Sequence, residues 1–196
     1  MLFTDEVNGA GDLMTDDIAD LVKSWYPNQV FKNCLEWCSG PGFLGFSILS
    51  HGLCNTLHLS DIYPLAGAVV KQTIALNGLE HKVNFHLSDN FKSFASDLTF
   101  DLIIANPPHF ACDPYAPVLT DPRRYKDTDW NTHRNFFNNV KQHLSPDGKI
   151  ILMENIWGSG LTTFEQMISH NDLKINRHQL SDKFKWDIWY LEVTHK

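Results

Sequence analysis

The sequence predicts an α/β fold, in which a mostly parallel sheet of seven strands is covered by helices on both faces. Short apolar segments of strand length alternate with helical segments along most of the chain, an order typical of a parallel sheet. Residues 102–105 (LIIA) are apolar throughout, as expected of a strand that is buried on both faces. The last two strand-like segments follow each other without a helix between them, so we expect an antiparallel hairpin to complete the sheet.

The first half of the chain begins with a predicted helix over residues 15–25. Apolar residues recur there at helical spacing behind Thr15, a residue type that commonly caps a helix. A proline in the first turn and Gly78 near the end bracket a second helix over residues 64–79. The other predicted elements of this half are a strand ending at residues 34–37, a glycine-rich turn into a helix at residues 40–45, and strands at residues 55–61, 82–89 and 100–106.

The second half is predicted to begin with a helix over residues 129–144, ended by the turn sequence SPDG at residues 145–148. The elements expected after it are a strand at residues 149–155, a helix at residues 161–169, and strands at residues 172–180 and 185–193. We expect one domain over residues 1–196, with residues 1–28 as an N-terminal helix and lid and residues 29–196 as the core.

A long loop over residues 107–125 stands apart from these elements. It contains five of the nine prolines of the chain and exceeds the usual length of connections in such folds. Loops of that length are commonly functional or disordered, so we expect this one to serve the site described below.

Composition sets limits on the class of protein. The 196 residues, 43% of them hydrophobic, suffice for one core, and no apolar run approaches the length needed to span a bilayer. The first 13 residues carry acids where a signal peptide needs positive charge. We therefore expect a cytoplasmic protein without membrane attachment, and a monomer is the simplest expectation.

The net charge, the cysteines and the histidines limit which ligands and covalent links we expect. The net charge of -7 argues against tight nonspecific binding to nucleic acid, although it leaves room for a local basic patch. The four cysteines form no C-x-x-C pair, and the ten histidines show no metal-ligand spacing. We expect reduced thiols and no metal site.

A glycine-rich turn follows the first strand. In residues 35–45 (LEWCSGPGFLG), Glu36 lies at the end of the strand and glycines open the next helix. Glycines let backbone N–H groups approach a ligand, and the start of a helix offers unpaired donors. The turn therefore predicts a nucleotide-type site; the alternative is a tight connection without a ligand.

Two further acids end the next two strands. Asp61 follows the second strand, where a carboxylate can accept both hydroxyls of a ribose or simply cap the next helix. Asp89 follows the third strand, and by itself it could be a solvated loop acid. Because the carboxyl ends of parallel strands meet at one edge of the sheet, the three acids together favour an adenosine-containing ligand.

The fourth strand ends in an N-P-P-H motif. Its residues are Asn106, Pro107, Pro108 and His109. Two consecutive prolines cannot donate to a sheet ladder, so the strand must stop after Ala105. As a stop signal alone the motif would need no ligand, but it follows three strand-end acids.

The whole pattern resembles the class I S-adenosylmethionine (SAM)-dependent methyltransferases. Within them it looks like the amino-methyltransferases whose fourth strand ends in Asn/Asp-Pro-Pro-aromatic, and the resemblance covers roughly residues 31–193. It implies a Rossmann-like sheet with strand order 3-2-1-4-5-7-6 and strand 7 antiparallel. It also implies methyl transfer from SAM, with S-adenosylhomocysteine as product, to a nitrogen of a nucleobase, a protein glutamine or a small-molecule amine.

For the cofactor, the resemblance implies a role for each residue of the glycine turn and of the strand ends. Gly40 and Gly42 would lie near the methionine part of SAM, in a turn that Glu36 would organise. Asp61 would bind the ribose and Ile62 would pack on the adenine, while Asp89 and Asn90 would hold the adenine amino group. Asn106 would border the cofactor. Cys38 stands where the family commonly has glycine. That departure puts the backbone geometry of the turn in question.

For the acceptor, the resemblance places the reacting nitrogen on the N-P-P-H motif. The Asn106 side-chain oxygen and the Pro107 carbonyl oxygen would each accept an N–H, which aims the lone pair and stabilises the developing positive charge. His109 takes the aromatic position of the motif and could stack on a planar acceptor. We favour stacking over a general-base role, because the methylated, cationic nitrogen can lose its proton to water.

Other residues are expected to contact the substrate. The loop residues with this expected role are Phe110, Arg123, Arg124 and Tyr125. The two arginines could bind an acidic substrate or belong to a solvated loop. Glu154 and Asn155 end the fifth strand on the same side, so either could also touch the substrate.

Two alternative functions remain open. A catalytically idle SAM-binding or scaffold subunit would suit the small size of the chain. A nicotinamide-dependent dehydrogenase also carries an acid after its second strand, but it leaves the N-P-P-H motif unexplained. Calorimetry with SAM and with NAD separates both methyltransferase readings from the dehydrogenase.

Overall fold

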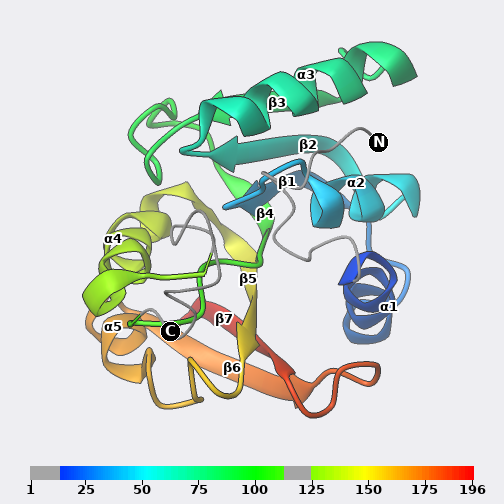
Figure 1. The fold of residues 1–196 in the computed structure, drawn as a ribbon. Coiled ribbons are helices and arrows are strands. Elements are labelled where there is room, and N and C mark those ends of the chain that lie inside the picture. The colour runs from blue at the N-terminus through cyan, green and yellow to red at the C-terminus, as the bar shows by residue number, and fades with distance from the viewer. Residues whose placement is uncertain (1–13, 113–124) are drawn as a thin grey trace.

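Seven strands form one sheet in the order β3-β2-β1-β4-β5-β7-β6 (Figure 1). The structure is a computed structural model, and it describes residues 14–112 and 125–196. The strands are β1 (Phe31–Trp37), β2 (Cys54–Asp61), β3 (Val83–Leu87), β4 (Phe100–Ala105), β5 (Leu144–Asn155), β6 (Leu173–Leu180) and β7 (Ile188–His195). Strands β1 to β5 pair in parallel, and β7 runs antiparallel to both β5 and β6. The predicted sheet and its strand order are therefore confirmed.

Helices cover both faces of the sheet. They are α1 (Thr15–Trp25), α2 (Phe43–Ser50), α3 (Pro64–Asn77), α4 (Asn131–Val140) and α5 (Glu165–His170), with 3₁₀ turns η3 (Thr128–Trp130) and η4 (Lys141–His143) on either side of α4. One hydrophobic cluster joins the sheet to α1, α2 and α3, and a second joins it to α4 and α5. These two groups of helices lie on opposite sides of the sheet in Figure 1.

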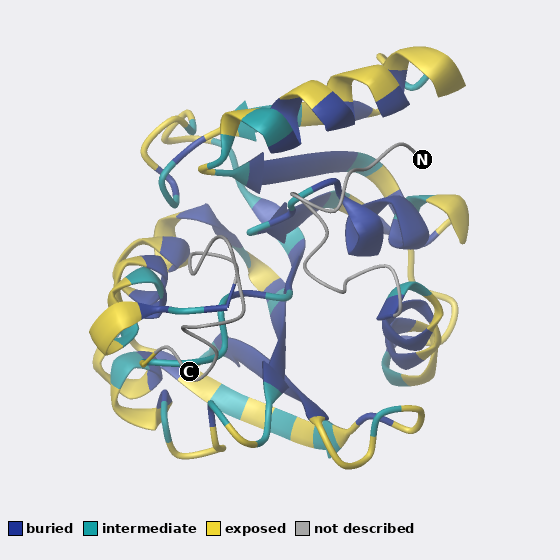
Figure 2. Ribbon diagram, viewed as in Figure 1, coloured by how far each residue is buried: buried dark blue, intermediate teal, exposed yellow. Residues whose placement is uncertain are grey.

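Consecutive residues of the central strands pack alternately into the two hydrophobic clusters. Ile103 packs into the cluster with α4 and α5, while Ile104 packs into the cluster with α1 to α3, and both are fully buried. This follows from the two-residue period of a strand. Burial on both faces explains why residues 102–105 of β4 are all apolar, and Figure 2 shows the middle of the sheet as buried.

The structure corrects the prediction for residues 145–148. We expected the SPDG sequence to be a turn before the fifth strand, but β5 already begins at Leu144. Phe100 pairs with Leu144 and Leu102 with Lys149, so the ladder shifts register across SPDG. Leu144 is buried, and it packs so close to Gly148 that a Cβ there would lie 2.6 Å from its Cδ1 and 2.9 Å from the Phe100 carbonyl oxygen.

Two helices are also shorter than predicted. We expected the fourth helix to begin at residue 129, but Asp129 and Trp130 have φ angles of 55° and 56°, and α4 begins at Asn131. Left-handed residues cannot continue an α-helix. The last helix, expected from residue 161, begins at Glu165. Among the described helices, none is long and apolar enough to cross a membrane.

Candidate functional site

The carboxyl ends of β1, β2, β3 and β4 surround a cavity of about 420 Å³. Several of its lining residues come from the expected cofactor and acceptor sites: Glu36, Cys38, Gly40, Asp61, Ile62, Asp89, Asn90, Asn106, Pro107, Pro108, His109 and Tyr125. The parallel order of these strands brings their ends to one edge of the sheet. Residues that are far apart in the sequence, from Glu36 to Thr132, therefore line one space.

The turn after β1 has the left-handed geometry that glycine favours. Cys38 adopts a φ of 55°, close to the 50° of Gly40. The Cys38 side chain thus occupies a conformation that costs little for glycine and more for other residues. Burial, followed by the nearby Asp61 carboxylate, raises the pKa of its thiol well above the usual range. Cys38 is therefore a neutral thiol that preserves the shape of the turn.

Glu36 fixes the start of α2. Its Oε2 accepts from the Gly45 amide at 2.7 Å and its Oε1 from the Leu44 amide at 3.3 Å. A Cβ at Gly45 would lie 2.8 Å from that Oε2, so the helix can approach the carboxyl group this closely only with glycine there. Burial raises the pKa of Glu36 to about 8, against the opposing effect of the two amides.

Asp61 joins the turns after β1 and β2. One carboxylate oxygen accepts from the Gly40 amide at 2.7 Å, and the other accepts from the Tyr63 amide at 2.8 Å. Burial raises the pKa of Asp61. Each carboxylate oxygen keeps a further lone pair, so the fixed carboxylate can still accept hydrogen bonds from a ligand in the cavity.

The carboxyl ends of β2 and β3 offer one unpaired polar atom each. Asp89 forms an ion pair with Lys92 and also accepts from the Asn90 side chain. The Oδ1 of Asn90 is buried without a hydrogen-bond partner among the described residues, and so is the Oγ of Ser60 in the same lining. Buried polar groups are almost always satisfied in the functional state. These atoms are therefore suited to a polar ligand such as a nucleoside.

The N-P-P-H motif borders the same cavity. Asn106 follows the last residue of β4, and its Oδ1 is buried without a hydrogen-bond partner in the described parts of the chain. An unpaired buried acceptor costs free energy, so this oxygen is available for an N–H donor. The next three residues, Pro107, Pro108 and His109, continue the wall of the cavity.

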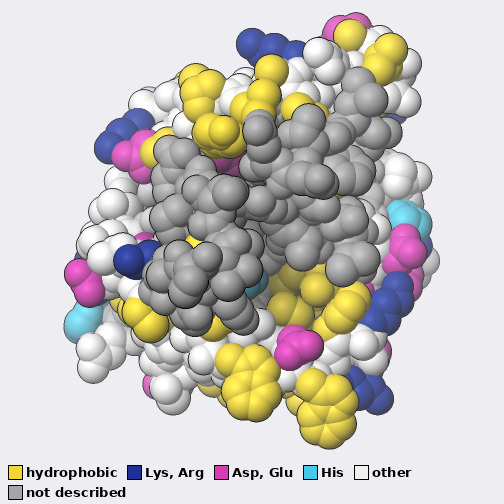
Figure 3. Space-filling view, viewed as in Figure 1, with side chains coloured by type: hydrophobic (Ala, Val, Ile, Leu, Met, Phe, Trp, Pro, Cys, Tyr) yellow, Lys and Arg dark blue, Asp and Glu magenta, His cyan; other side chains and the backbone are white. Residues whose placement is uncertain are grey.

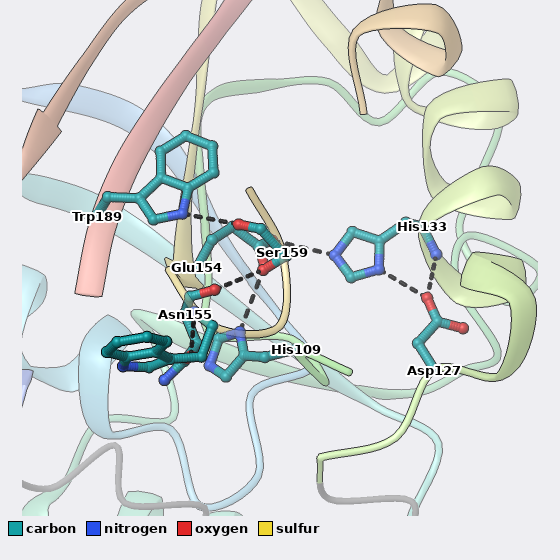
Figure 4. A network of polar contacts seen from close by, with 8 residues as sticks. His109, Asp127, His133, Glu154, Asn155, Ser159 and Trp189 are labelled. Carbon is teal, nitrogen blue, oxygen red and sulfur yellow. Dashed lines mark hydrogen bonds and ion pairs between the residues drawn. The ribbon is translucent and has the colours of Figure 1, made fainter. Parts of the chain in front are cut away.

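His109 is the first member of a buried chain of ionisable side chains (Figure 4). Its Nδ1 lies 3.3 Å from Oε2 of Glu154, whose Oε1 lies 3.1 Å from Nε2 of His133. The Nδ1 of His133 lies 2.7 Å from Oδ2 of Asp127. We call Asp127, His133, Glu154 and His109 the tetrad; the side chains of the first three are buried, and that of His109 is 16% exposed.

The sequence analysis named two members of this tetrad, His109 and Glu154, and missed Asp127 and His133. Glu154 was one of two residues that could touch the substrate; its side chain is fully buried and contacts His109, His133 and Ser159. Asp127 and His133 gave no signal in the sequence, because the partners of His133 are 6 and 21 positions away. Only the fold brings the end of β5 beside α4.

The remaining expected residues have different positions. Gly42 does not line the cavity; its φ is 86°, and a Cβ there would meet the side chains of Leu59 and Phe46. Phe110 is also outside the lining, and its backbone pairs with Tyr125 and Asp127 across the base of the long loop. Arg123 and Arg124 lie outside the described residues.

Large apolar side chains are exposed near the closing strands. Trp157 is 75% exposed and Trp186 is 80% exposed, and the Trp157 indole N–H donates to Asp187 at 3.2 Å. Figure 3 shows hydrophobic side chains gathered along the lower margin of the face in view. Within residues 14–112 and 125–196, no group of three potential metal ligands comes together.

Comparison with known proteins gives a family match. The sequence model of the family described as methyltransferase small domain matches residues 14–178. A release factor glutamine methyltransferase of Leptospira interrogans is 31% identical over 135 residues, which are 67% of this chain and 45% of that protein. A tRNA1(Val) (adenine(37)-N6)-methyltransferase of a Flavobacteriaceae bacterium is 24% identical over 146 residues, 74% of this chain and 60% of that protein. The chain thus spans about half the length of the release factor methyltransferases it matches.

Solved structures share the fold. A ribosomal protein L11 methylase from Lactobacillus delbrueckii subsp. bulgaricus superposes with a TM-score of 0.65 at 19% identity, over 93% of this chain and 79% of that one. The glycopeptide N-methyltransferase MtfA, complexed with SAM, superposes with a TM-score of 0.68 at 11% identity, over 93% and 94% of the two chains. At such identities the likeness concerns the fold alone.

Proposed function

The chain belongs to the methyltransferase small domain family, and from that premise we propose that it is a SAM-dependent N-methyltransferase. Its acceptor would be an amine or amide nitrogen held by the N-P-P-H motif. The curated relatives that it matches are named for methylating glutamine in release factors or adenine in tRNA. Both acceptors present a planar nitrogen group.

The observation that carries the proposal is the unpaired oxygen of Asn106. This Oδ1 is buried at the carboxyl end of β4, beside the cavity, without a partner among the described residues. A planar NH₂ group entering the cavity would supply the missing donor. The contact would satisfy a group whose burial otherwise costs about 1–3 kcal/mol.

The residues around the cavity are suited to SAM. The Asp61 carboxylate, oriented by the Gly40 and Tyr63 amides, would accept the two ribose hydroxyls. Ile62 would offer its exposed side chain to the adenine, and the unpaired Oδ1 of Asn90 would accept from a polar hydrogen of the nucleoside. Glu36 and Cys38 would act indirectly, by fixing the turn that carries Gly40.

The chain contributes orientation and electrostatics to the transfer. When bound, SAM supplies an electrophilic methyl group on a sulfonium. The Asn106 and Pro107 oxygens would hold two N–H groups of the acceptor, so that the nitrogen lone pair points along the line of displacement. The same oxygens would stabilise the positive charge that grows on the nitrogen. The two prolines limit movement of the carbonyl group between them.

Residues other than those that would bind SAM and the acceptor nitrogen would determine the class of acceptor. We propose that the long loop contributes to that choice, through Tyr125 at its described end and through Arg123 and Arg124. A protein glutamine and a nucleobase both present a planar NH₂ group to the motif, and a small-molecule amine would present N–H donors to the same two oxygens. The idle-subunit alternative would leave the Asn106 oxygen without a role.

The free cysteines bear on where the protein works. Cys34, Cys38, Cys54 and Cys112 are all free thiols, as is usual in a reducing compartment. We propose a cytoplasmic location and a monomer as the working form.

Binding and transfer can be tested separately. Calorimetry should detect binding of SAM and S-adenosylhomocysteine but not NAD. Tritiated SAM should then label a component of a cell lysate, and prior digestion with nuclease or with protease should show whether the acceptor is nucleic acid or protein. Binding of NAD without SAM would contradict the proposal, and SAM binding without transfer to any fraction would favour the idle subunit.

A further inference from the structure

The ring of His109 is held from its buried edge. Its Nδ1 lies 3.3 Å from Oε2 of Glu154, and the two side chains are 16% and 0% exposed. In Figure 4 the Glu154 carboxylate lies between the rings of His109 and His133. An ionised carboxylate only accepts hydrogen bonds, so the contact requires a proton on Nδ1 of His109.

The other members of the tetrad keep Glu154 ionised. Both ring nitrogens of His133 face carboxylate oxygens, Glu154 on one side and Asp127 on the other, so the ring donates twice and is an imidazolium. Burial alone would lower the pKa of His133, but Glu154 and Asp127 raise it to about 9. The pKa of Glu154 is lowered despite its burial, first by His133 and then by the hydrogen bond with His109.

Asp127 fixes this arrangement to the start of α4. Its carboxylate also accepts from the amides of Thr132 and His133, at 2.8 and 3.0 Å. Ser159 donates to Oε2 of Glu154 at 2.5 Å, the same oxygen that faces His109. Backbone and hydroxyl groups therefore hold both carboxylates, and neither can turn away from its histidine without losing a hydrogen bond.

The charges of the tetrad leave room for one more proton. Two carboxylates and one imidazolium carry one unbalanced negative charge in a buried region, as long as His109 is neutral. A proton on His109 would balance it. With Nδ1 bound to Glu154, the ring nitrogen that remains is Nε2, which has no hydrogen-bond partner among the described residues, on a side chain that lines the cavity.

We propose that His109 accepts the proton released by the acceptor nitrogen, and that Glu154, His133 and Asp127 are positioning residues that keep Nε2 unprotonated. This rests on the proposed function. In the transfer, the nitrogen lone pair forms the bond to the methyl carbon, and the sulfur–carbon bond breaks with its electron pair remaining on sulfur. As the nitrogen–carbon bond forms, the N–H bond breaks, its electron pair stays on nitrogen, and the proton passes to Nε2 of His109.

The tautomer can be measured without substrate or SAM. Ring-nitrogen chemical shifts distinguish a protonated from an unprotonated nitrogen, and His109→Phe assigns the His109 signals by their loss. In the neutral wild-type ring we expect the proton on Nδ1. Glu154→Gln should abolish that preference. Asp17→Asn is the matched control, because Asp17 is a buried carboxylate that accepts from Ser181 and Tyr190 on the other face of the sheet, and it should leave the tautomer unchanged.

Two results would overturn the positioning role. One is a proton on Nε2 in the neutral wild-type ring. The other is an unchanged His109 tautomer in folded Glu154→Gln protein. The wild-type measurement uses only His109→Phe, for assignment, so it decides the first point even if Glu154→Gln fails to fold.

Methyl transfer tests the proton-acceptor role. His109→Phe keeps a ring that can stack on the acceptor but cannot take a proton. Its single-turnover rate should fall by about 100-fold, with unchanged SAM affinity by calorimetry. A wild-type rate in His109→Phe would overturn the role and leave the proposed function standing. Wild-type protein that binds no SAM and transfers no methyl group would instead overturn the proposed function, and the proton-acceptor role with it.

Discussion

Gly158 touches the backbone of His109: a Cβ built on Gly158 would lie 2.2 Å from the His109 carbonyl oxygen and 2.6 Å from the Phe110 ring. The turn after β5 therefore supports the segment that follows the N-P-P-H motif. Backbone atoms cannot move aside as the end of a flexible side chain can, so any larger residue at this position must displace the segment that carries His109.

Gly158→Ala should consequently impair both stability and methyl transfer. Overpacking of this kind costs about 1–3 kcal/mol, measurable by urea unfolding. Gly160→Ala is the matched control, since its Cβ would meet nothing nearer than the Thr163 Oγ1 at 4.0 Å. Equal stability and equal transfer rates in the two variants would show that the contact is not required.

Asp61→Ala should weaken SAM binding by roughly 2–4 kcal/mol, the scale of losing two charge-assisted hydrogen bonds. Calorimetry on folded protein measures this. Asp101→Ala makes a suitable control, because Asp101 also accepts from two backbone amides, those of Lys32 and Asn33 near the start of β1. Both variants should lose stability, and only Asp61→Ala should lose affinity. Full SAM affinity in Asp61→Ala would show that this carboxylate does not bind the ribose.

Asn106→Ala should abolish most of the turnover without destabilising the fold. Its Oδ1 has no partner within the described residues, so its removal breaks no hydrogen bond of that oxygen in the free protein. The transition state would lose a charge-stabilising acceptor, worth about 100-fold or more in rate. Thermal unfolding and calorimetry should give near wild-type values. Wild-type turnover would contradict the assignment of the acceptor nitrogen to this residue.

The pH dependence of stability should carry a contribution from His133. Its pKa is raised from 6.5 to about 9, because the Glu154 and Asp127 carboxylates outweigh burial. A raised folded-state pKa contributes stability that is complete below the unfolded value and is lost as pH rises through the folded value. The advantage of wild type over His133→Gln should therefore shrink between about pH 6 and about pH 9.5, by on the order of 3 kcal/mol.

Urea unfolding at both pH values measures this difference. The pKa of Glu36 is raised to about 8 mainly by burial, so its contribution to the free energy of unfolding also falls as the pH rises. Glu36 is present in both proteins, and its effect cancels in the difference. A constant difference between wild type and His133→Gln would mean that the His133 ring is not charged in the folded state.

Arg123 and Arg124 provide a prediction from the sequence alone, since both lie outside the described residues. Replacing the two together by Ala should raise the apparent KM for the methyl acceptor and leave SAM affinity unchanged. If the acceptor is a nucleic acid, binding should also become less dependent on salt, because fewer counterions are released. An unchanged KM would make this part of the loop a spacer.

The elements that the sequence predicted well are those in which one local signal dominates. The helix over residues 15–25 has a strong apolar period, and the structure gives it those same bounds. Alternation of strands and helices predicted the parallel sheet, and the strand order followed from the family resemblance. SPDG, by contrast, carries every local mark of a turn, and only the pairing of Leu144 with Phe100 draws it into β5.

The same distinction applies to the site. Residues at strand ends could be predicted to line one cavity, because parallel strands place their carboxyl ends together. The partnership of His109 with Glu154 could not, because 45 positions separate them and the chain passes through the long loop and α4 in between. No local pattern encodes the distance between two such segments.

The bridge between Phe110 and Lys126 joins the described segments on either side of the long loop. Phe110 accepts from the Asp127 amide at 2.8 Å and donates to the Tyr125 carbonyl at 2.9 Å, so two described segments at the ends of the long loop lie next to each other. Insertions or deletions between these anchors change the closure entropy only slowly with length. Evolution, or a protein engineer, could therefore exchange the stretch between these anchors for another while keeping the strand ends that surround the cavity, and if the proposed function holds, such an exchange would be a route to other acceptors.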